Sequence, residues 1–246
     1  MFFFDAHLHL AQSKFDISLG NFDEYSVVSC SFSESEFLKQ NLMIDLIKKN
    51  NKNISFYRSF GIHPQSPSLT ELDFLESLLK DNKIDAIGEC GFDFYTSDLK
   101  KSERNQDLCW NAQIELALFY DVPIILHGRK SNHKFFSYLN ELKKLPFVIF
   151  HSYSGTLIEA YSFLNKNVNA FFSFGKTILN GKKAAIECIK LLPVETLLLE
   201  TDSPYQTLKG ESYTKTSDIF DVYKKANEIR CIDFSEVIKS PFQKNL

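Results

Sequence analysis

Short apolar runs alternate with longer segments of helical spacing along the whole chain. Most runs are too continuously apolar to leave one face in water, as expected for strands that lie between helices and a barrel interior. The eight runs are Phe2–His7, Ser26–Phe32, Ile54–Gly61, Asp85–Glu89, Pro123–His127, Phe147–His151, Ala170–Phe174 and Thr196–Glu200. This alternation predicts an α/β protein with a parallel sheet and crossover helices, here a (β/α)8 TIM barrel.

Helical spacing fills most of the intervals between the runs. The expected helices are Glu34–Lys49, Leu69–Leu79, Ser102–Tyr120, Lys134–Lys143, Lys182–Leu191 and Ser217–Ile229. The first crossover, Ala11–Tyr25, is weakly patterned and predicts no definite helix. No Pro-, Gly- or Ser-rich linker interrupts the series, so we expect a single barrel domain over residues 1–246.

Composition and charge narrow the class of protein. With 246 residues, 44% hydrophobic and 24% charged, the chain has the size and balance of one globular barrel, and its 24 phenylalanines are expected to fill the core. Five cysteines without a CxxC pair indicate reduced thiols, and there is neither a basic signal-type N-terminus nor an uncharged run of membrane-spanning length. We therefore expect a cytoplasmic protein, away from membranes, and nothing in the chain indicates an obligate protein partner. A net charge of −3 provides no general attraction to nucleic acid.

Residue types that bind metals fall at the ends of the apolar runs. In a (β/α)8 barrel the C-terminal strand ends open onto one face, where active sites form. Residues that are distant in sequence are therefore expected to converge there. They are His7, His9, His63, Glu89, His127, His151 and Asp202.

The histidines strengthen this interpretation. His7 and His9 are two apart on a strand, so both side chains point to the same face. Five of the six histidines lie at strand ends, and the sixth, His133, begins an expected surface helix. Such a mixture of imidazole and carboxylate suits zinc, manganese or iron better than calcium, and carboxylate-rich sites also bind magnesium.

The same strand ends carry longer motifs. The segments DAHLHL (5–10), GIHP (61–64), AIGECGFD (86–93), IILHGR (124–129), FHSYSG (150–155) and LLLETDSPY (197–205) resemble, in order and spacing, the signatures of the TatD family of metal-dependent hydrolases. This family belongs to the amidohydrolase superfamily. The resemblance implies a (β/α)8 fold and DNase activity, often the removal of nucleotides from a 3′ end, with DNA ends as the substrate.

The resemblance also implies roles for individual residues. It implies that His7, His9, Glu89 and Asp202 bind one divalent cation and that Glu89, His127 and His151 bind a second, with zinc, magnesium and manganese as candidates. Glu89 would then bridge the two cations, because a carboxylate can bind one through each oxygen. Asp202 would orient the attacking water and take its proton, while the metal pair clamps the attacking and leaving oxygens.

Further residues are candidates for substrate contacts or for orienting ligands. His63 is a candidate catalytic and substrate-binding residue that would touch a phosphate oxygen, or it packs on Pro64. Arg129 could bind phosphate or pair with a carboxylate, and Tyr205 could be a pocket wall or a base-stacking surface. Asp5, Asp93 and Glu200 are expected to orient ligands rather than bind metal. Strand alternation points Cys90 away from the site into the core.

The chain also departs from the family pattern. Gln65 stands where a second histidine is usual, the stretch after Tyr205 lacks the usual Pro, Arg and Asn residues, and the SPFQKNL tail matches poorly. These departures leave the substrate open. The main hypothesis is a phosphodiesterase acting on single-stranded DNA ends. The alternatives are hydrolysis of a small amide, lactone or phosphoester, and a non-catalytic metal-binding protein.

Overall fold

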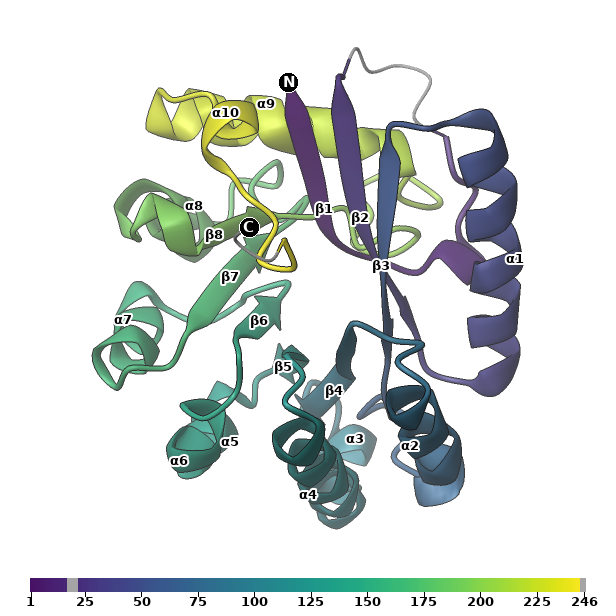
Figure 1. Ribbon diagram of the computed structural model, residues 1–246. Helices are drawn as coiled ribbons and strands as arrows, with labels where there is room; N and C mark the ends of the chain where they lie inside the picture. Colours follow the sequence, from purple (N-terminus) through teal and green to yellow (C-terminus); the bar gives the residue numbers. More distant parts are fainter. Residues whose placement is uncertain (17–21, 244–246) are drawn as a thin grey trace.

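The computed structural model describes residues 1–16 and 22–243, and these residues contain an eight-stranded parallel barrel (Figure 1). Each strand pairs with the next in parallel, from β1 to β8. The strands are β1 (Phe2–Leu8), β2 (Glu24–Ser31), β3 (Ile54–Phe60), β4 (Ala86–Asp93), β5 (Ile124–Arg129), β6 (Val148–His151), β7 (Ala170–Phe174) and β8 (Leu197–Leu199). Two backbone hydrogen bonds connect the segment after the last strand to the first strand and the residues that follow it, from Asp202 N to His7 O (2.9 Å) and from His9 N to Ser203 O (2.8 Å). The predicted (β/α)8 fold is confirmed.

Helices surround the barrel on its outside (Figure 1). The α-helices are α1 (Glu34–Asn50), α2 (Leu72–Lys80), α3 (Ser97–Lys101), α4 (Glu103–Tyr120), α5 (Asn132–Phe135), α6 (Leu139–Leu142), α7 (Leu157–Asn165), α8 (Lys183–Leu191), α9 (Ile219–Arg230) and α10 (Phe234–Val237). Among the described residues, no helix has the length and apolarity needed to cross a membrane.

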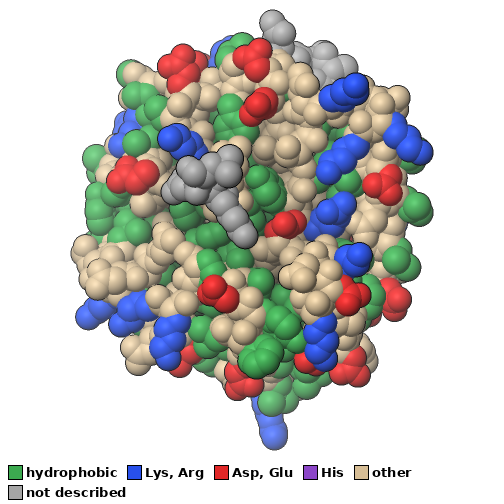
Figure 2. Space-filling model, in the orientation of Figure 1, with side chains coloured by type: hydrophobic (Ala, Val, Ile, Leu, Met, Phe, Trp, Pro, Cys, Tyr) green, Lys and Arg blue, Asp and Glu red, His purple; other side chains and the backbone are tan. Residues whose placement is uncertain are grey.

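Helix α1 illustrates how the local sequence specifies these elements. The Ser33 side chain accepts a hydrogen bond from Glu36 N and so caps the start of the helix. Lys48 and Lys49 lie in the last turn, where positive charges interact favourably with the negative end of the helix dipole. Phe37 and Ile44 are buried on the face toward the barrel. Elsewhere on the surface, Lys and Arg side chains are interspersed with Asp and Glu on the face shown in Figure 2.

The helices differ from the expectation in two ways: one expected helix is broken, and some helices were not expected. The expected helix Lys134–Lys143 is instead α5, a 3-10 turn at Phe136–Tyr138, and α6. At this turn Phe136 stacks on Phe163 of α7, with ring centroids 4.3 Å apart, so side-chain packing overrides a regular helical period. Helices α3, α7 and α10 were not among the expected helices, although Thr156 and Glu159 form a capping box at the start of α7.

The weakly patterned first crossover, Ala11–Tyr25, contains a short 3-10 turn at Leu10–Gln12, and β2 already begins at Glu24. Residues 17–21 of this crossover, and residues 244–246 of the tail, lie outside the described residues.

Strand β4 is longer than expected and is irregular where it carries Glu89. It continues past Glu89 to Asp93, and its register with β5 shifts between Ile87 and Cys90. Gly88 has φ +134°, and a Cβ there would lie 2.5 Å from the carbonyl oxygen of Ile125. Only glycine fits this close approach of the two backbones. The irregular part of β4 thus carries Glu89, and Asp93 follows four residues later at the end of the same strand.

Candidate metal centre and active site

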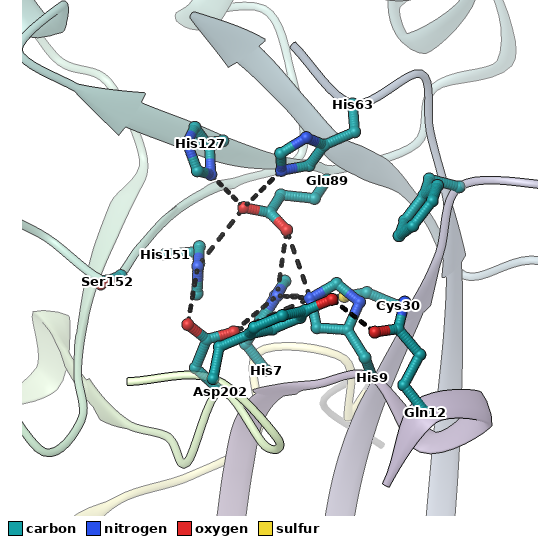
Figure 3. Close-up of polar contacts among 12 residues, drawn as sticks. His7, His9, Gln12, Cys30, His63, Glu89, His127, His151, Ser152 and Asp202 are labelled. Atoms are coloured by element: carbon teal, nitrogen blue, oxygen red, sulfur yellow. Dashed lines mark hydrogen bonds and ion pairs between the residues drawn. The ribbon is translucent and has the colours of Figure 1, made fainter. Parts of the chain in front are cut away.

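The carboxylate of Glu89 lies at the centre of a buried cluster of imidazoles (Figure 3). Its Oε2 is 3.3 Å from His7 Nε2 and 3.5 Å from His9 Nε2. Its other oxygen, Oε1, contacts His127 Nδ1 and lies 3.4 Å from His151 Nε2. Each oxygen of one carboxylate therefore faces a different group of histidines.

Asp202 faces the same cluster from the segment after β8. Its Oδ1 is 3.7 Å from both His7 Nε2 and His9 Nε2, and its Oδ2 is 3.9 Å from His151 Nε2. All six residues predicted to bind metal thus lie together at the C-terminal ends of the strands. Three compact groups of potential ligand atoms occur among the described residues, namely His7–His9–Glu89, His7–His151–Asp202 and His63–Glu89–His127.

His63 lies deeper than a purely substrate-contacting residue would. Its Nε2 is 3.5 Å from Glu89 Oε1, about as close as His151 Nε2, and its side chain is only 13% exposed. Its Nδ1 accepts a hydrogen bond from Gln65 N. His63 therefore belongs to the group of potential ligand atoms around Glu89, and it also lines the cavity above them.

Two of the three carboxylates expected to orient ligands contact an imidazole. Glu200 Oε2 lies 3.1 Å from His151 Nδ1, and Asp93 Oδ2 lies 3.0 Å from His127 Nε2. Each contact leaves the other ring nitrogen facing Glu89. Such partners select the tautomer and hold the ring of a metal-binding histidine.

Asp5 acts on the backbone instead of on an imidazole. It accepts hydrogen bonds from Thr201 N (2.9 Å) and from the Thr201 hydroxyl (2.7 Å), and a longer one from His7 N (3.3 Å). The side chain therefore holds β1 against the segment that carries Asp202. Burial raises the pKa of Asp5 to about 7, although the hydrogen bonds from Thr201 oppose this rise.

Two polar contacts were not anticipated from the sequence. Cys30 Sγ lies 3.1 Å from His7 Nδ1, and the Ser59 hydroxyl donates a hydrogen bond to this sulfur. Cys30 thus occupies, for His7, the position that a carboxylate occupies for His151 and His127. No local motif marks it, because the contact joins two different strands. Cys90, in contrast, is buried with its Sγ 3.6 Å from Ile125 O.

Gln206 connects several groups around Asp202. Its Nε2 lies 2.9 Å from Ser152 Oγ, 3.2 Å from Glu200 Oε1 and 3.2 Å from Asp202 Oδ2. It belongs to the divergent stretch after Tyr205. The buried Lys176 contacts Glu211 in the same stretch at 2.6 Å and thereby ties it to the end of β7.

Burial and charge perturb the two central carboxylates in opposite directions. Burial alone would raise the pKa of Glu89, but the adjacent His151, His63 and His127 outweigh it and hold that pKa well below its ordinary value. For Asp202 burial prevails over the opposing His151 and His9 and raises the pKa to about 6. Burial would lower the pKa of His151, but Glu200, Glu89 and Asp202 raise it to about 10.

This donor set fits divalent cations. Buried carboxylates and imidazoles approach one another within metal-ligand range, and their outer nitrogens are already engaged by Asp93, Glu200 and Cys30. A cation between them would offset the desolvation of Asp202 and Glu89. Nitrogen and oxygen donors of this kind suit zinc, manganese or magnesium.

Cation binding at this cluster should stabilise the fold measurably. A ligand at 100 times its Kd adds about 2.7 kcal/mol to the free energy of unfolding, which corresponds to about 5–10 °C in Tm for a chain of this size. Differential scanning fluorimetry of chelator-treated protein, titrated with zinc, manganese or magnesium, measures the shift. His7→Ala should reduce it, whereas His133→Ala, which removes a histidine outside the cluster, should retain it. An unchanged Tm with all three metals would contradict metal binding here.

The cluster forms the floor of a cavity of about 810 Å³. Arg129 and Tyr205 both line this cavity. The sequence left Arg129 either to bind phosphate or to pair with a carboxylate. In the structure its Nη1 lies 3.7 Å from Asp93 Oδ2, so it has a carboxylate partner. The Tyr205 ring lies edge-on to His9 with centroids 5.2 Å apart, and its hydroxyl donates to Gln12.

Comparison with known proteins places this geometry in a family. The model of the TatD-related DNase family matches residues 4–244. An uncharacterised metal-dependent hydrolase of Mycoplasma genitalium is 31% identical over 226 residues, which cover 84% of this chain and 82% of that protein. The 3′-5′ ssDNA/RNA exonuclease TatD of Pantoea ananatis is 32% identical over 149 residues. That match covers 59% of this chain and 56% of the exonuclease, so it spans little more than half of each.

Solved structures agree with the fold. YjjV, a TatD homologue from Escherichia coli, superposes with a TM-score of 0.76 at 24% identity and covers 96% of this chain and 93% of its own. A TatD-family hydrolase from Entamoeba histolytica superposes with a TM-score of 0.74 at 21% identity, covering 95% and 93%.

Proposed function

The chain belongs to the TatD-related DNase family of metal-dependent hydrolases, and from this premise we propose that it removes nucleotides from single-stranded DNA ends, in the 3′-5′ direction, with two divalent cations. The polarity is suggested by the exonuclease names of partly matching relatives. The observation that carries the proposal is the position of Glu89, whose two oxygens face separate groups of histidines.

In this proposal, each residue of the cluster has a defined task. Two cations would supply Lewis acidity to the attacking and leaving oxygens of the phosphodiester. Asp202 orients the water and accepts its proton at the carboxylate, where a pKa of about 6 leaves the base ionised at neutral pH. Asp93 and Glu200 keep His127 and His151 in the tautomers that face the centre.

The charge distribution favours a substrate that is held at few points. With a net charge of −3, the chain has little general attraction for a polyanion, so contacts near the centre must provide binding. His63, whose Nε2 is 3.5 Å from Glu89 Oε1, and Arg129 both line the cavity and could contact a phosphate there. A strand end that enters a cavity from solvent meets these groups more easily than a stacked duplex does.

We therefore expect distributive digestion of single-stranded ends. On end-labelled DNA with magnesium or manganese, single strands should be shortened faster than blunt duplex, and closed circles should persist. Two or three phosphate contacts predict a slope of only about −2 when the logarithm of the binding constant is plotted against that of the salt concentration. Labels at the 3′ and 5′ ends report the polarity.

Three outcomes would contradict this function. Rapid cutting of closed circular duplex, or a steep salt dependence, would require an extended basic track. A lack of cleavage of any DNA, together with good turnover of small esters, amides or lactones, would assign the centre to small-molecule hydrolysis. Turnover of neither class, with metal bound, would indicate a non-catalytic metal-binding protein.

A further inference from the structure

The cavity above the cluster is larger than one phosphate group requires. Its volume of about 810 Å³ is near the upper end of the roughly 300–1,000 Å³ typical of small-molecule sites. The lining extends from Glu89 and Asp202 on the floor to Tyr95, Arg129 and Lys130 beside the end of β5. Groups of the substrate beyond the cleaved phosphate therefore have room to bind.

Tyr95, Arg129 and Lys130, hereafter the rim cluster, lie against one another at one side of this cavity. The guanidinium carbon of Arg129 is 4.1 Å from the centroid of the Tyr95 ring, and Lys130 Nζ is 4.7 Å from it. Tyr95 is 54% exposed. Both cations are thus held by one aromatic platform while they remain accessible to a ligand.

The backbone also holds the rim cluster in place. Tyr95 N donates to Asp93 Oδ1 at 2.9 Å, and Lys130 has φ +56°, a left-handed conformation that is unfavourable for a lysine. Asp93 also lies 3.7 Å from Arg129 Nη1 and 3.0 Å from His127 Nε2. One buried carboxylate therefore connects the rim cluster to an imidazole of the proposed metal centre.

The charges around the cavity separate into an acidic floor and a basic rim. Glu89 and Asp202 lie on the floor, whereas Arg129, Lys130 and Lys182 line the sides. Two cations near a single ring repel each other, and an anion that contacts both relieves this repulsion. The remaining carboxylate of the lining, Glu159, is engaged by the capping box of α7.

We propose that the rim cluster is a second phosphate subsite, which binds the phosphodiester adjacent to the one that is hydrolysed. This inference rests on the proposed nuclease function. It assigns to Tyr95 and Lys130 a role in distinguishing substrates by length. A substrate with a neighbouring phosphate binds more tightly because of these residues, and one with a single phosphodiester does not. Arg129 and Lys130 supply the positive charge, and Tyr95 holds both in position.

The test compares two substrates across a matched series of variants. Wild-type enzyme with manganese is assayed on a single-stranded DNA decamer and on bis-p-nitrophenyl phosphate, which has one phosphodiester and no neighbour. Lys130→Ala and Tyr95→Leu should raise KM for the decamer about fivefold and make its salt slope shallower by about 0.7, the change expected for one lost phosphate contact. Tyr95→Phe keeps the ring and should match wild type. Lys49→Ala, at the far end of α1, controls for loss of a surface charge.

The possible results separate this inference from the function on which it rests. Hydrolysis of bis-p-nitrophenyl phosphate should change less than twofold in every variant. If the wild type does not cleave the decamer, the nuclease function fails. If it does, and Lys130→Ala leaves KM and salt slope unchanged, the second subsite fails. An equal loss on both substrates would also overturn it, because the rim cluster would then act on the cleaved phosphate or on the fold.

Discussion

A Glu89→Gln variant should fold but lose most of its activity and its ability to hold two cations. Glutamine has the shape of glutamate but only one good acceptor oxygen, so it cannot bind a cation on each side. In the structure Oε2 faces His7 and His9, and Oε1 faces His127 and His151. Because a single interaction with developing transition-state charge is typically worth about 10²–10³ in kcat, we expect a loss of roughly 10³-fold or more.

Metal analysis distinguishes this role from a general structural one. After reconstitution and removal of free metal, wild-type protein should contain up to two divalent ions per chain and Glu89→Gln fewer than one. His7→Ala should mainly empty one position, because His7 contacts only one oxygen of Glu89. Cys90→Ala, a change at the adjacent buried residue, should keep wild-type metal content. Two ions per chain in Glu89→Gln would refute the bridging role.

The barrel was predictable because its signal is local and repeated. Each strand is a short apolar run, and the rule that parallel strand ends meet at one face brings residues as distant as His7 and Asp202 together without knowledge of any contact. The same rule placed His127 and His151 near Glu89. The roles of these residues as ligands stay predictions, which the Glu89 and Asp202 variants test.

Features that depend on packing between segments were not predictable. The extension of β4 to Asp93 follows from glycines that allow close backbone approach to β5, and the break between α5 and α6 follows from aromatic packing on a neighbouring helix. Periodicity along one segment reports neither. Sequence motifs also identify residues by their neighbours in the chain, so they found Asp93 in GFD but not Cys30, whose partner lies on another strand.

Gln206 could not be predicted from the sequence for a different reason. It lies in the stretch that departs from the family pattern, where resemblance supplies no role, yet it donates toward Asp202 and Glu200. The divergent stretch therefore reaches the candidate catalytic residues through Gln206. Its attachment through Lys176, which contacts both Glu211 and Asp218, shows that the departure in sequence is accompanied by specific contacts.

Asp202 is the residue whose change separates catalysis from metal binding most clearly. Its Oδ1 faces His7 and His9, while Oδ2 receives a hydrogen bond from Gln206. Asparagine keeps the size of the side chain and one acceptor oxygen, so the fold and much of the metal binding should survive. It cannot take a proton at neutral pH, and we therefore expect kcat to fall by about 10²–10⁴-fold, the usual contribution of a general base.

The measurement is steady-state turnover of bis-p-nitrophenyl phosphate and of single-stranded DNA by Asp202→Asn, with the metal content of the same sample determined in parallel. A large fall in kcat at unchanged metal content supports the role as base, whereas a fall that tracks lost metal assigns Asp202 to ligation alone. Asp98→Asn makes the same chemical change at an exposed position of α3 and should leave both quantities unchanged. Activity within a few-fold of wild type in Asp202→Asn would remove this residue from the mechanism, because the asparagine side chain cannot accept the proton of the attacking water.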